Sequence, residues 1–279
     1  MAHPERAVTG LPFNRTPDGK IDQRRFGNIM HEVLHRLYGP LKGESNAGRK
    51  IAALSRSREI IRETIISAAM DEMRWDRETL MSGRGVIIID VLERYARELL
   101  EYDGVNPDMT LLHLEEDFSG AHTVVCGGEE VRITLGGRVD RIDLTGGAVR
   151  VVDYKTGAPK REVFTAEGLF DEEKEKRNDA FLQALLYCTL IEKSHPGKMV
   201  LPAIYWIQQL SSDEFSPYAP VTGLKGPESA ISEWGSFMNE YREHLNLALN
   251  NIFSADEDYR MTAFRRRCTF CPYRTLCRR

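Results

Sequence analysis

The sequence predicts an α/β fold in which helices flank a small central mixed sheet. Apolar residues recur at helical spacing between residues 21 and 38. From Met109 the spacing changes to two and continues through a Gly-Gly pair between apolar segments, which indicates a hairpin. A helical stretch at 181–193 then precedes a short apolar run at 200–207, as expected for a helix that leads into another core strand.

Composition limits the class of protein. The chain has 279 residues, enough for one large domain or two small ones, and 42% of them are hydrophobic. No apolar run is long enough to span a membrane, and the first residues lack the apolar core of a signal peptide. We therefore expect a cytoplasmic protein with no membrane partner, whose thiols are free or metal-bound.

Charge is unevenly distributed. The net charge of −4 argues against a protein that coats nucleic acid nonspecifically, yet residues 260–279 hold seven arginines and no acidic residue. A basic tail on an acidic body suits local contact with phosphate, and the alternative is a solvated terminus. We divide the chain into a domain at 1–259 and a basic tail at 260–279.

The remaining elements follow from periodicity and from breaker residues. In chain order we expect an irregular lead-in at 1–20, a helix at 21–38, a polar linker at 41–57, two helical stretches within 58–102 that separate near Gly83 and Gly85, strands from 109 to 155, a charged insertion at 158–179, a helix at 181–193, a strand at 200–207, a loop at 211–227 and a helix at 231–252.

The hairpin around Gly146 and Gly147 sets a register. A two-residue loop places Thr145 opposite Ala148. The same register continues through three further pairs on one face: Leu144 with Val149, Ile142 with Val151, and Asp140 with Asp153. On the other face it pairs Asp143 with Arg150, an ion pair with an ordinary structural role.

The apolar face of this hairpin ends in charge. Asp140 and Asp153 lie opposite each other, and Arg138 opposite Lys155. Two carboxylates at about 5 Å between Cβ atoms repel each other unless something compensates. A hard divalent cation would do so, and a salt-bridge cluster at the rim of the sheet is an equal alternative from the hairpin alone.

Three segments resemble a known family. Asp140 in GRVDRID and Asp153-Tyr154-Lys155 in VVDYKTG resemble the PD-(D/E)XK nuclease superfamily, and specifically its RecB-like branch. FGNIMHEVLHRLY resembles the first RecB-like motif, a Gly followed by a metal-binding His on a helix, with His31 in the matching position. QALLY resembles the Gln-x3-Tyr motif, which would place Gln183 and Tyr187 on one helix face.

The resemblance covers about residues 26–277 and implies a restriction-endonuclease-like core. It implies that His31, Asp140 and Asp153 hold Mg²⁺ or Mn²⁺, with the backbone carbonyl of Tyr154 as a further ligand. Lys155 would then position the hydroxide that the metal activates or stabilise the transition state.

The other implied contacts are with DNA. Gln183 and Tyr187 would bind phosphodiester oxygens, and Arg138 is a further candidate contact. The implied activity is a metal-dependent DNA nuclease of exonuclease type that acts on single-stranded ends in repair or recombination. The nearest resemblance is to the AddB-type C-terminal nuclease domain, so the expected partner is a helicase domain or subunit.

Three cysteines end the chain. Cys268, Cys271 and Cys277 form Cys-x2-Cys-x5-Cys, a spacing that resembles the C-terminal part of an AddB-type iron–sulfur motif. A [4Fe–4S] cluster needs a fourth thiolate, and neither Cys126 nor Cys188 is well placed. We expect an incomplete cluster site, with a zinc knuckle as the competing interpretation.

Two other functions stay open. A CRISPR-associated nuclease of the same superfamily is close, although that group usually has Glu where this chain has Asp153. The chain could also be a catalytically silent module for DNA binding or assembly, which the presence of every motif residue argues against.

Overall fold

The computed structural model describes residues 23–158, 164–171, 173, 178–212, 215–218, 231–254 and 261–278. The described helices are α1 (Gln23–Tyr38), α2 (Ala47–Leu54), α3 (Arg58–Met73), α4 (Arg77–Leu80), α5 (Gly83–Gly104), α6 (Ala166–Phe170), α7 (Asp179–Ile191) and α8 (Ile231–Phe253). The strands are β1 (Thr110–Cys126), β2 (Glu129–Thr145), β3 (Ala148–Lys155) and β4 (Val200–Trp206). Short 3-10 turns are η1 (Gly39–Leu41), η2 (Glu192–Ser194), η3 (Ile207–Gln209) and η5 (Arg265–Phe270).

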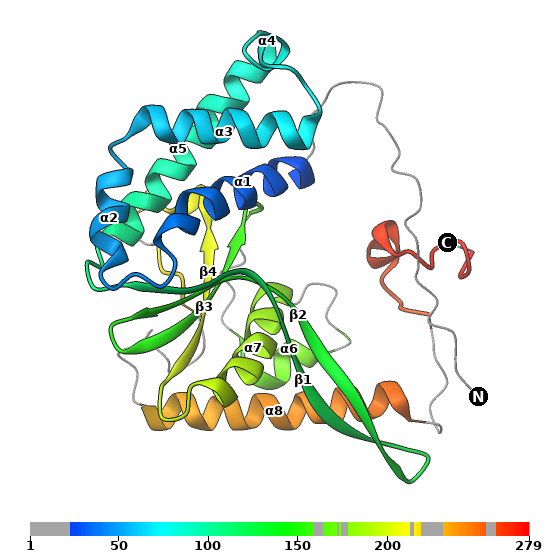
Figure 1. The fold of residues 1–279 in the computed structure, drawn as a ribbon. Coiled ribbons are helices and arrows are strands. Elements are labelled where there is room, and N and C mark those ends of the chain that lie inside the picture. The colour runs from blue at the N-terminus through cyan, green and yellow to red at the C-terminus, as the bar shows by residue number, and fades with distance from the viewer. Residues whose placement is uncertain are drawn as a thin grey trace, which may run out of the picture.

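One mixed sheet organises the fold, in the order β1-β2-β3-β4. The pairs β1–β2 and β2–β3 are antiparallel, and β3–β4 is parallel. Helices α1 to α5 cover one face of the sheet, while α6, α7 and α8 lie on the other (Figure 1). The connection through α6 and α7 joins the two parallel strands, as parallel pairing requires. The predicted mixed sheet between helices is confirmed.

The central hairpin has the predicted loop. Gly146 and Gly147 have φ of 59° and 83°, the left-handed values that a two-residue loop of this kind needs. All five pairs between β2 and β3 keep the predicted register. The ladder nevertheless ends at Arg141 and Val152, so the expected outer pairs, Asp140 with Asp153 and Arg138 with Lys155, do not form part of it.

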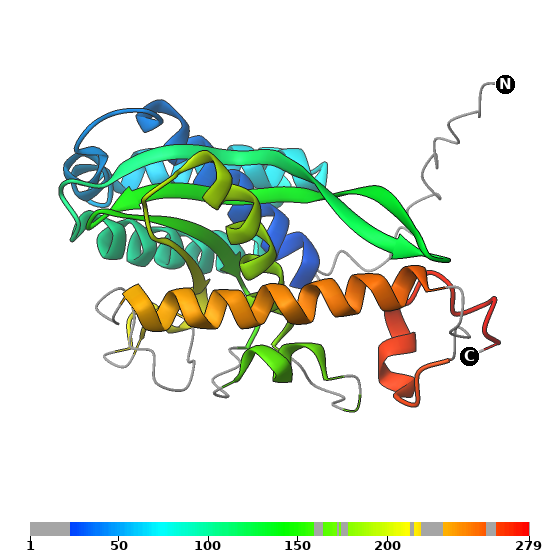
Figure 2. The same cartoon turned by 90° about the horizontal axis from the view of Figure 1, so that it is seen from below.

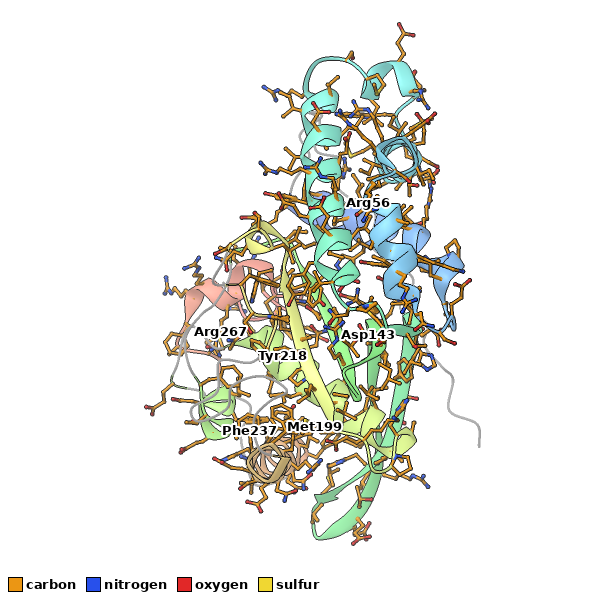
Figure 3. All side chains as sticks on the ribbon, turned by 90° about the vertical axis from the view of Figure 1, so that its left-hand side faces the viewer. Arg56, Asp143, Met199, Tyr218, Phe237 and Arg267 are labelled. Carbon is orange, nitrogen blue, oxygen red and sulfur yellow. The ribbon has the colours of Figure 1, made fainter. Side chains whose placement is uncertain are left out.

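The face of β2 and β3 opposite α7 is buried as well. Arg150 and Asp143 form the predicted ion pair, with Nε 2.7 Å from Oδ1, and Asp143 is fully buried. Arg141 lies beside them and binds Asp103 of α5 through Nη1 at 2.5 Å. Figure 3 shows Asp143 among the side chains between the sheet and the helical layer of α1 to α5. We call Asp103, Arg141, Asp143 and Arg150 the buried ionic cluster.

Helix α2 lies where a polar linker was expected, so that prediction is wrong. A Cβ on Gly48 would lie 1.8 Å from the carbonyl oxygen of Asn106, and one on Gly104 would lie 2.9 Å from Ala52. These small residues allow α2 to pack closely against α5, and Ile51 is fully buried there. Close packing therefore supports a helix of only eight residues, which would be marginal in isolation.

The charged insertion also contains a helix, α6, whose Ala166 and Leu169 are fully buried. The predicted lead-in at 1–20 and most of the expected loop at 211–227 lie outside the described residues, as do Arg260 and Arg279 of the tail.

Strands β1 and β2 continue beyond the sheet as a long hairpin, and α8 runs toward its tip (Figure 2). The side chain of Asn250 on α8 accepts a hydrogen bond from the backbone N–H of Val125 at 2.8 Å. Helix α8 therefore packs against the outer part of the hairpin and also against the apolar core on the α7 side of the sheet.

Candidate functional site

The candidate site lies at the carboxyl end of β3, beneath α1 (Figure 1). Helix α1 contributes His31, β1 contributes Glu115 and β2 contributes Asp140. Strand β3 adds Asp153 and Lys155. The site thus forms where α1, which belongs to the helical layer of α1 to α5, meets β1, β2 and β3.

His31 is at the centre of the group. Its Nδ1 lies 3.2 Å from Glu115 Oε1 and 3.5 Å from Asp140 Oδ1. Its Nε2 lies 3.2 Å from the carbonyl oxygen of Tyr154. Gly27, one turn earlier, faces the residue that follows β3, because a Cβ there would lie at an ordinary contact distance of 3.4 Å from Thr156 Oγ1. The glycine and histidine of α1 therefore both face the end of β3.

Both ring nitrogens of His31 face acceptors, which favours the doubly protonated imidazolium in the metal-free protein. Burial opposes this charge, but the hydrogen bond to Glu115 and the charges of Asp140, Glu115 and Asp153 raise the pKa of His31 above its ordinary value. When protonated, His31 thus partly offsets the negative charge of the carboxylates around it.

Glu115 was not among the sequence candidates. It has a φ of 50°, a left-handed conformation that non-glycine residues rarely adopt. The register of β1 against β2 shifts between Leu111 and His113, shortly before it. The neighbouring Glu116 is bound by His113 and Lys42 instead. The sequence shows adjacent acidic residues in this strand. It does not show the backbone conformation that brings Glu115, and not Glu116, to His31.

Asp140 and Asp153 make different bonds. Oδ2 of Asp140 accepts the backbone N–H of Tyr154 at 2.8 Å, which replaces a ladder bond between the strands. Lys155 donates to Asp153 at 2.8 Å. Burial, followed by the charge of Asp153, raises the pKa of Asp140 to about 7. Burial also raises the pKa of Asp153, against the opposing effect of Lys155.

Tyr154 joins the site to the buried ionic cluster. Its backbone N–H and carbonyl bind Asp140 and His31, as described above. Its ring packs edge-on against His31, with 5.8 Å between the ring centroids, and Arg141 donates to its hydroxyl at 2.9 Å. One residue therefore contacts two candidate metal ligands and a fully buried guanidinium.

The candidate DNA contacts lie in different surroundings. Arg138 is 61% exposed and its Nε donates to the backbone carbonyl of Glu115 at 3.0 Å. Gln183 donates to the hydroxyl of Tyr187 at 3.1 Å, so the two motif residues of α7 are bound to each other. A Cβ on Gly137 would lie 2.6 Å from that hydroxyl, which shows that Tyr187 packs directly against the glycine of β2.

The tail cysteines are free and partly exposed. Among the described residues they do not form a close group of metal-ligating atoms with one another or with other such side chains. Cys268 adjoins a pocket lined by Arg265, Arg274 and Arg278.

The site has a donor set that fits a divalent cation. Ligand atoms of His31, Glu115 and Asp140 all lie within 4.8 Å of one another, and only this group is found in the described part of the chain. Carboxylate oxygens and an imidazole nitrogen suit Mg²⁺ or Mn²⁺. Burial and the nearby charge of Asp153 raise the pKa of Asp140, and a bound cation would stabilise its charged carboxylate.

A sequence model of the PD-(D/E)XK nuclease superfamily matches residues 5–278, nearly the whole chain. The chain belongs to this superfamily. Its members are typically metal-dependent nucleases, so membership supports nuclease activity and DNA binding. No curated protein matches the sequence. None of the described helices is long and apolar enough to cross a membrane.

Proposed function

We propose that this member of the PD-(D/E)XK superfamily is a metal-dependent deoxyribonuclease of exonuclease type that acts in DNA repair or recombination. We further propose that it is the nuclease part of a helicase–nuclease, as the RecB-like and AddB-type resemblance of its motifs implies. The observation that carries the activity is the convergence of His31, Glu115 and Asp140 beside Asp153 and Lys155.

In this proposal His31, Asp140 and Asp153 hold Mg²⁺ or Mn²⁺, and Glu115 and the carbonyl of Tyr154 complete the set of oxygen donors. When bound, the cation lowers the pKa of a water molecule and neutralises charge on the scissile phosphate. Lys155 is one-third exposed and its ammonium lies beside the donor set, where it stabilises charge that develops on the phosphate.

DNA binding in this proposal uses the surfaces next to the donor set. Arg138 is exposed on β2 and binds a phosphate of the strand that enters the site. Gln183 is exposed on α7 and contacts the phosphodiester, while the buried Tyr187 orients its amide through their hydrogen bond. A single-stranded end is the preferred substrate, and hydrolysis leaves a 5′-phosphate.

The test is cleavage of end-labelled single- and double-stranded DNA with Mn²⁺, with Mg²⁺ and with EDTA. We expect shortening of the labelled strand only with metal. Lys155→Ala should lower the rate by about 10²–10³-fold without loss of fold. Lys198→Ala, at an exposed lysine outside the site, is the matched control and should cleave as the wild type does.

Two outcomes would contradict this proposal. Cleavage by Lys155→Ala at the wild-type rate would contradict the proposed mechanism. Wild-type protein that binds DNA but leaves it intact under every metal condition would instead identify a silent DNA-binding module.

A further inference from the structure

We propose that the N-terminus of α7 is a binding site for a phosphate group of the DNA strand and that Asn178 is its principal side chain. This inference rests on the proposed function, because it names a substrate contact for the same site. Asn178 was not singled out by any motif.

Asn178 has an unusual environment for an amide. It is the N-cap residue of α7 and only 7% exposed, yet neither its Oδ1 nor its Nδ2 has a hydrogen-bond partner. Buried polar side chains are nearly always hydrogen-bonded, so each exception calls for an explanation such as a bound group. The amide of Asn178 therefore has unused hydrogen-bonding capacity.

The same side chain also fails to cap its helix. Asparagine is among the best N-cap residues because its oxygen accepts an N–H of the first turn, but Asn178 makes no such bond. Asn46, Ser57 and Ser82 likewise make no side-chain cap bond, whereas the N-cap residues of two other helices do. Thr165 accepts from Gly168 at 3.1 Å, and Asp76 accepts from Thr79 at 2.7 Å.

The direction of α7 places this end near the candidate site. The C-terminal end of α7 leads through η2 to Met199, whose carbonyl binds Val149 at the start of β3. A helix of 13 residues is about 20 Å long, close to the length of β3. Because α7 packs against β3 and β4 and returns the chain from the end of one to the start of the other, its N-terminus lies toward the edge where β3 ends in Lys155 (Figure 1).

The chemistry of this end selects an anion. The first N–H groups of a helix and its dipole attract negative charge, and phosphate is a frequent ligand there. Asp179 lies in the same first turn and is engaged in an interaction of its own, so the phosphate would bind the remaining donors. The Nδ2 of Asn178 adds two N–H donors. Gln183 lies on the same helix between Asn178 and Tyr187, so a strand bound at the helix N-terminus would continue along α7. A phosphodiester of DNA fits these donors without any base contact.

The experiment measures binding of a fluorescent single-stranded DNA by anisotropy in Mn²⁺, with the Lys155→Ala protein as the parent so that the probe stays intact. Asn178→Asp is the decisive change. A carboxylate at this buried position is expected to lower the melting temperature whatever the role of the residue. The readout is therefore the DNA affinity of the folded protein, which a purely structural role leaves unchanged. A phosphate site predicts repulsion, and we expect at least about tenfold weaker binding.

Two further variants complete the test. Asn178→Ala removes the amide without adding charge, and we expect about three- to tenfold weaker binding. Asn46→Asp makes the same substitution at the N-cap of α2, in the other helical layer, and should leave affinity within about twofold of the parent.

DNA affinity of Asn178→Asp and Asn178→Ala equal to that of the parent would overturn the inference, and so would equal losses in the Asn178 and Asn46 variants. If Asn178→Asp does not fold, the affinity of Asn178→Ala decides alone. Failure of the proposed function is a separate result, because it would be seen as wild-type protein that does not cleave DNA in Mn²⁺.

Discussion

Glu115 has a backbone conformation that places a negative charge beside two others. Its positive φ is unfavourable for a glutamate, and conformations of this kind concentrate at functional sites. Here the conformation brings its carboxylate to His31, whereas the next residue, Glu116, binds Lys42. The strained residue is thus the one that joins the donor set.

We therefore predict that Glu115→Gln weakens Mn²⁺ binding by about tenfold or more, because the variant loses a charged ligand from a hard-cation site. Isothermal titration of the protein with Mn²⁺ measures this. Glu116→Gln is the matched control and should bind Mn²⁺ as the wild type does. Equal affinities of the two variants would remove Glu115 from the donor set.

Asp140 supports a prediction about pH for the metal-free protein. Burial and the charge of Asp153 raise its folded-state pKa to about 7, above the ordinary value of about 4. The folded state then binds more protons than the unfolded state between these values, so the free energy of unfolding falls as pH rises from about 4 to about 7.

Asp140→Asn removes this penalty while its amide oxygen can still accept the N–H of Tyr154. In EDTA at pH 8 we expect the variant to be more stable than the wild type by about 1–3 kcal/mol, with little difference at pH 4.5. Urea denaturation at the two pH values measures both. Asp117→Asn, an exposed position on β1, should show no such pattern. A variant less stable than the wild type at pH 8 would contradict this account.

At the scale of elements, contacts in the core fix the position of β3 and therefore of the site residues at its end. The Tyr154 hydroxyl is held by Arg141, which also binds Asp103 at the end of α5. The same tyrosine presents its backbone to Asp140 and His31. The buried ionic cluster therefore positions the strand that carries Asp153 and Lys155.

Tyr154→Phe and Tyr205→Phe separate positioning from stability. Both hydroxyls contact Arg141, at 2.9 Å and 3.3 Å, but Tyr205 lies on β4 and does not contact the donor set. We expect each variant to lose about 1–2 kcal/mol of unfolding free energy. Only Tyr154→Phe should weaken Mn²⁺ binding, by about tenfold. Titration calorimetry beside urea denaturation measures the two effects, and equal Mn²⁺ affinities would show that the hydroxyl serves stability alone.

At the scale of the whole molecule, two cores on opposite faces of the sheet carry the fold, and neither includes a described residue of the tail. We predict that a chain truncated to residues 1–259 folds with nearly the same melting temperature as the full chain, as measured by circular dichroism. The tail supplies three thiols, whereas a cubane cluster needs four. Anaerobically purified full chain should therefore hold no complete cluster. About four irons per chain, or loss of fold on truncation, would contradict the prediction.

Much of the fold and several candidate site residues could be predicted from local sequence patterns. The glycine pair at 146 and 147 predicted the register of the central hairpin, because a two-residue loop leaves only one alignment of alternating side chains. The same pattern led to Asp140, Asp153 and Lys155, and motif spacing led to His31. Hydrophobic periodicity and turn residues depend on a few neighbouring positions, and they can therefore be recognised in the sequence.

Only the tertiary structure decided what depends on distant segments. The positive φ of Glu115, the end of the β2–β3 ladder before Asp140, and the burial of Arg141 against Asp103 each arise from contacts between elements far apart in the chain. Helix α2 forms because Gly48 and Gly104 permit close packing. Such effects are determined by the space and charge that other segments supply, and no local period encodes them.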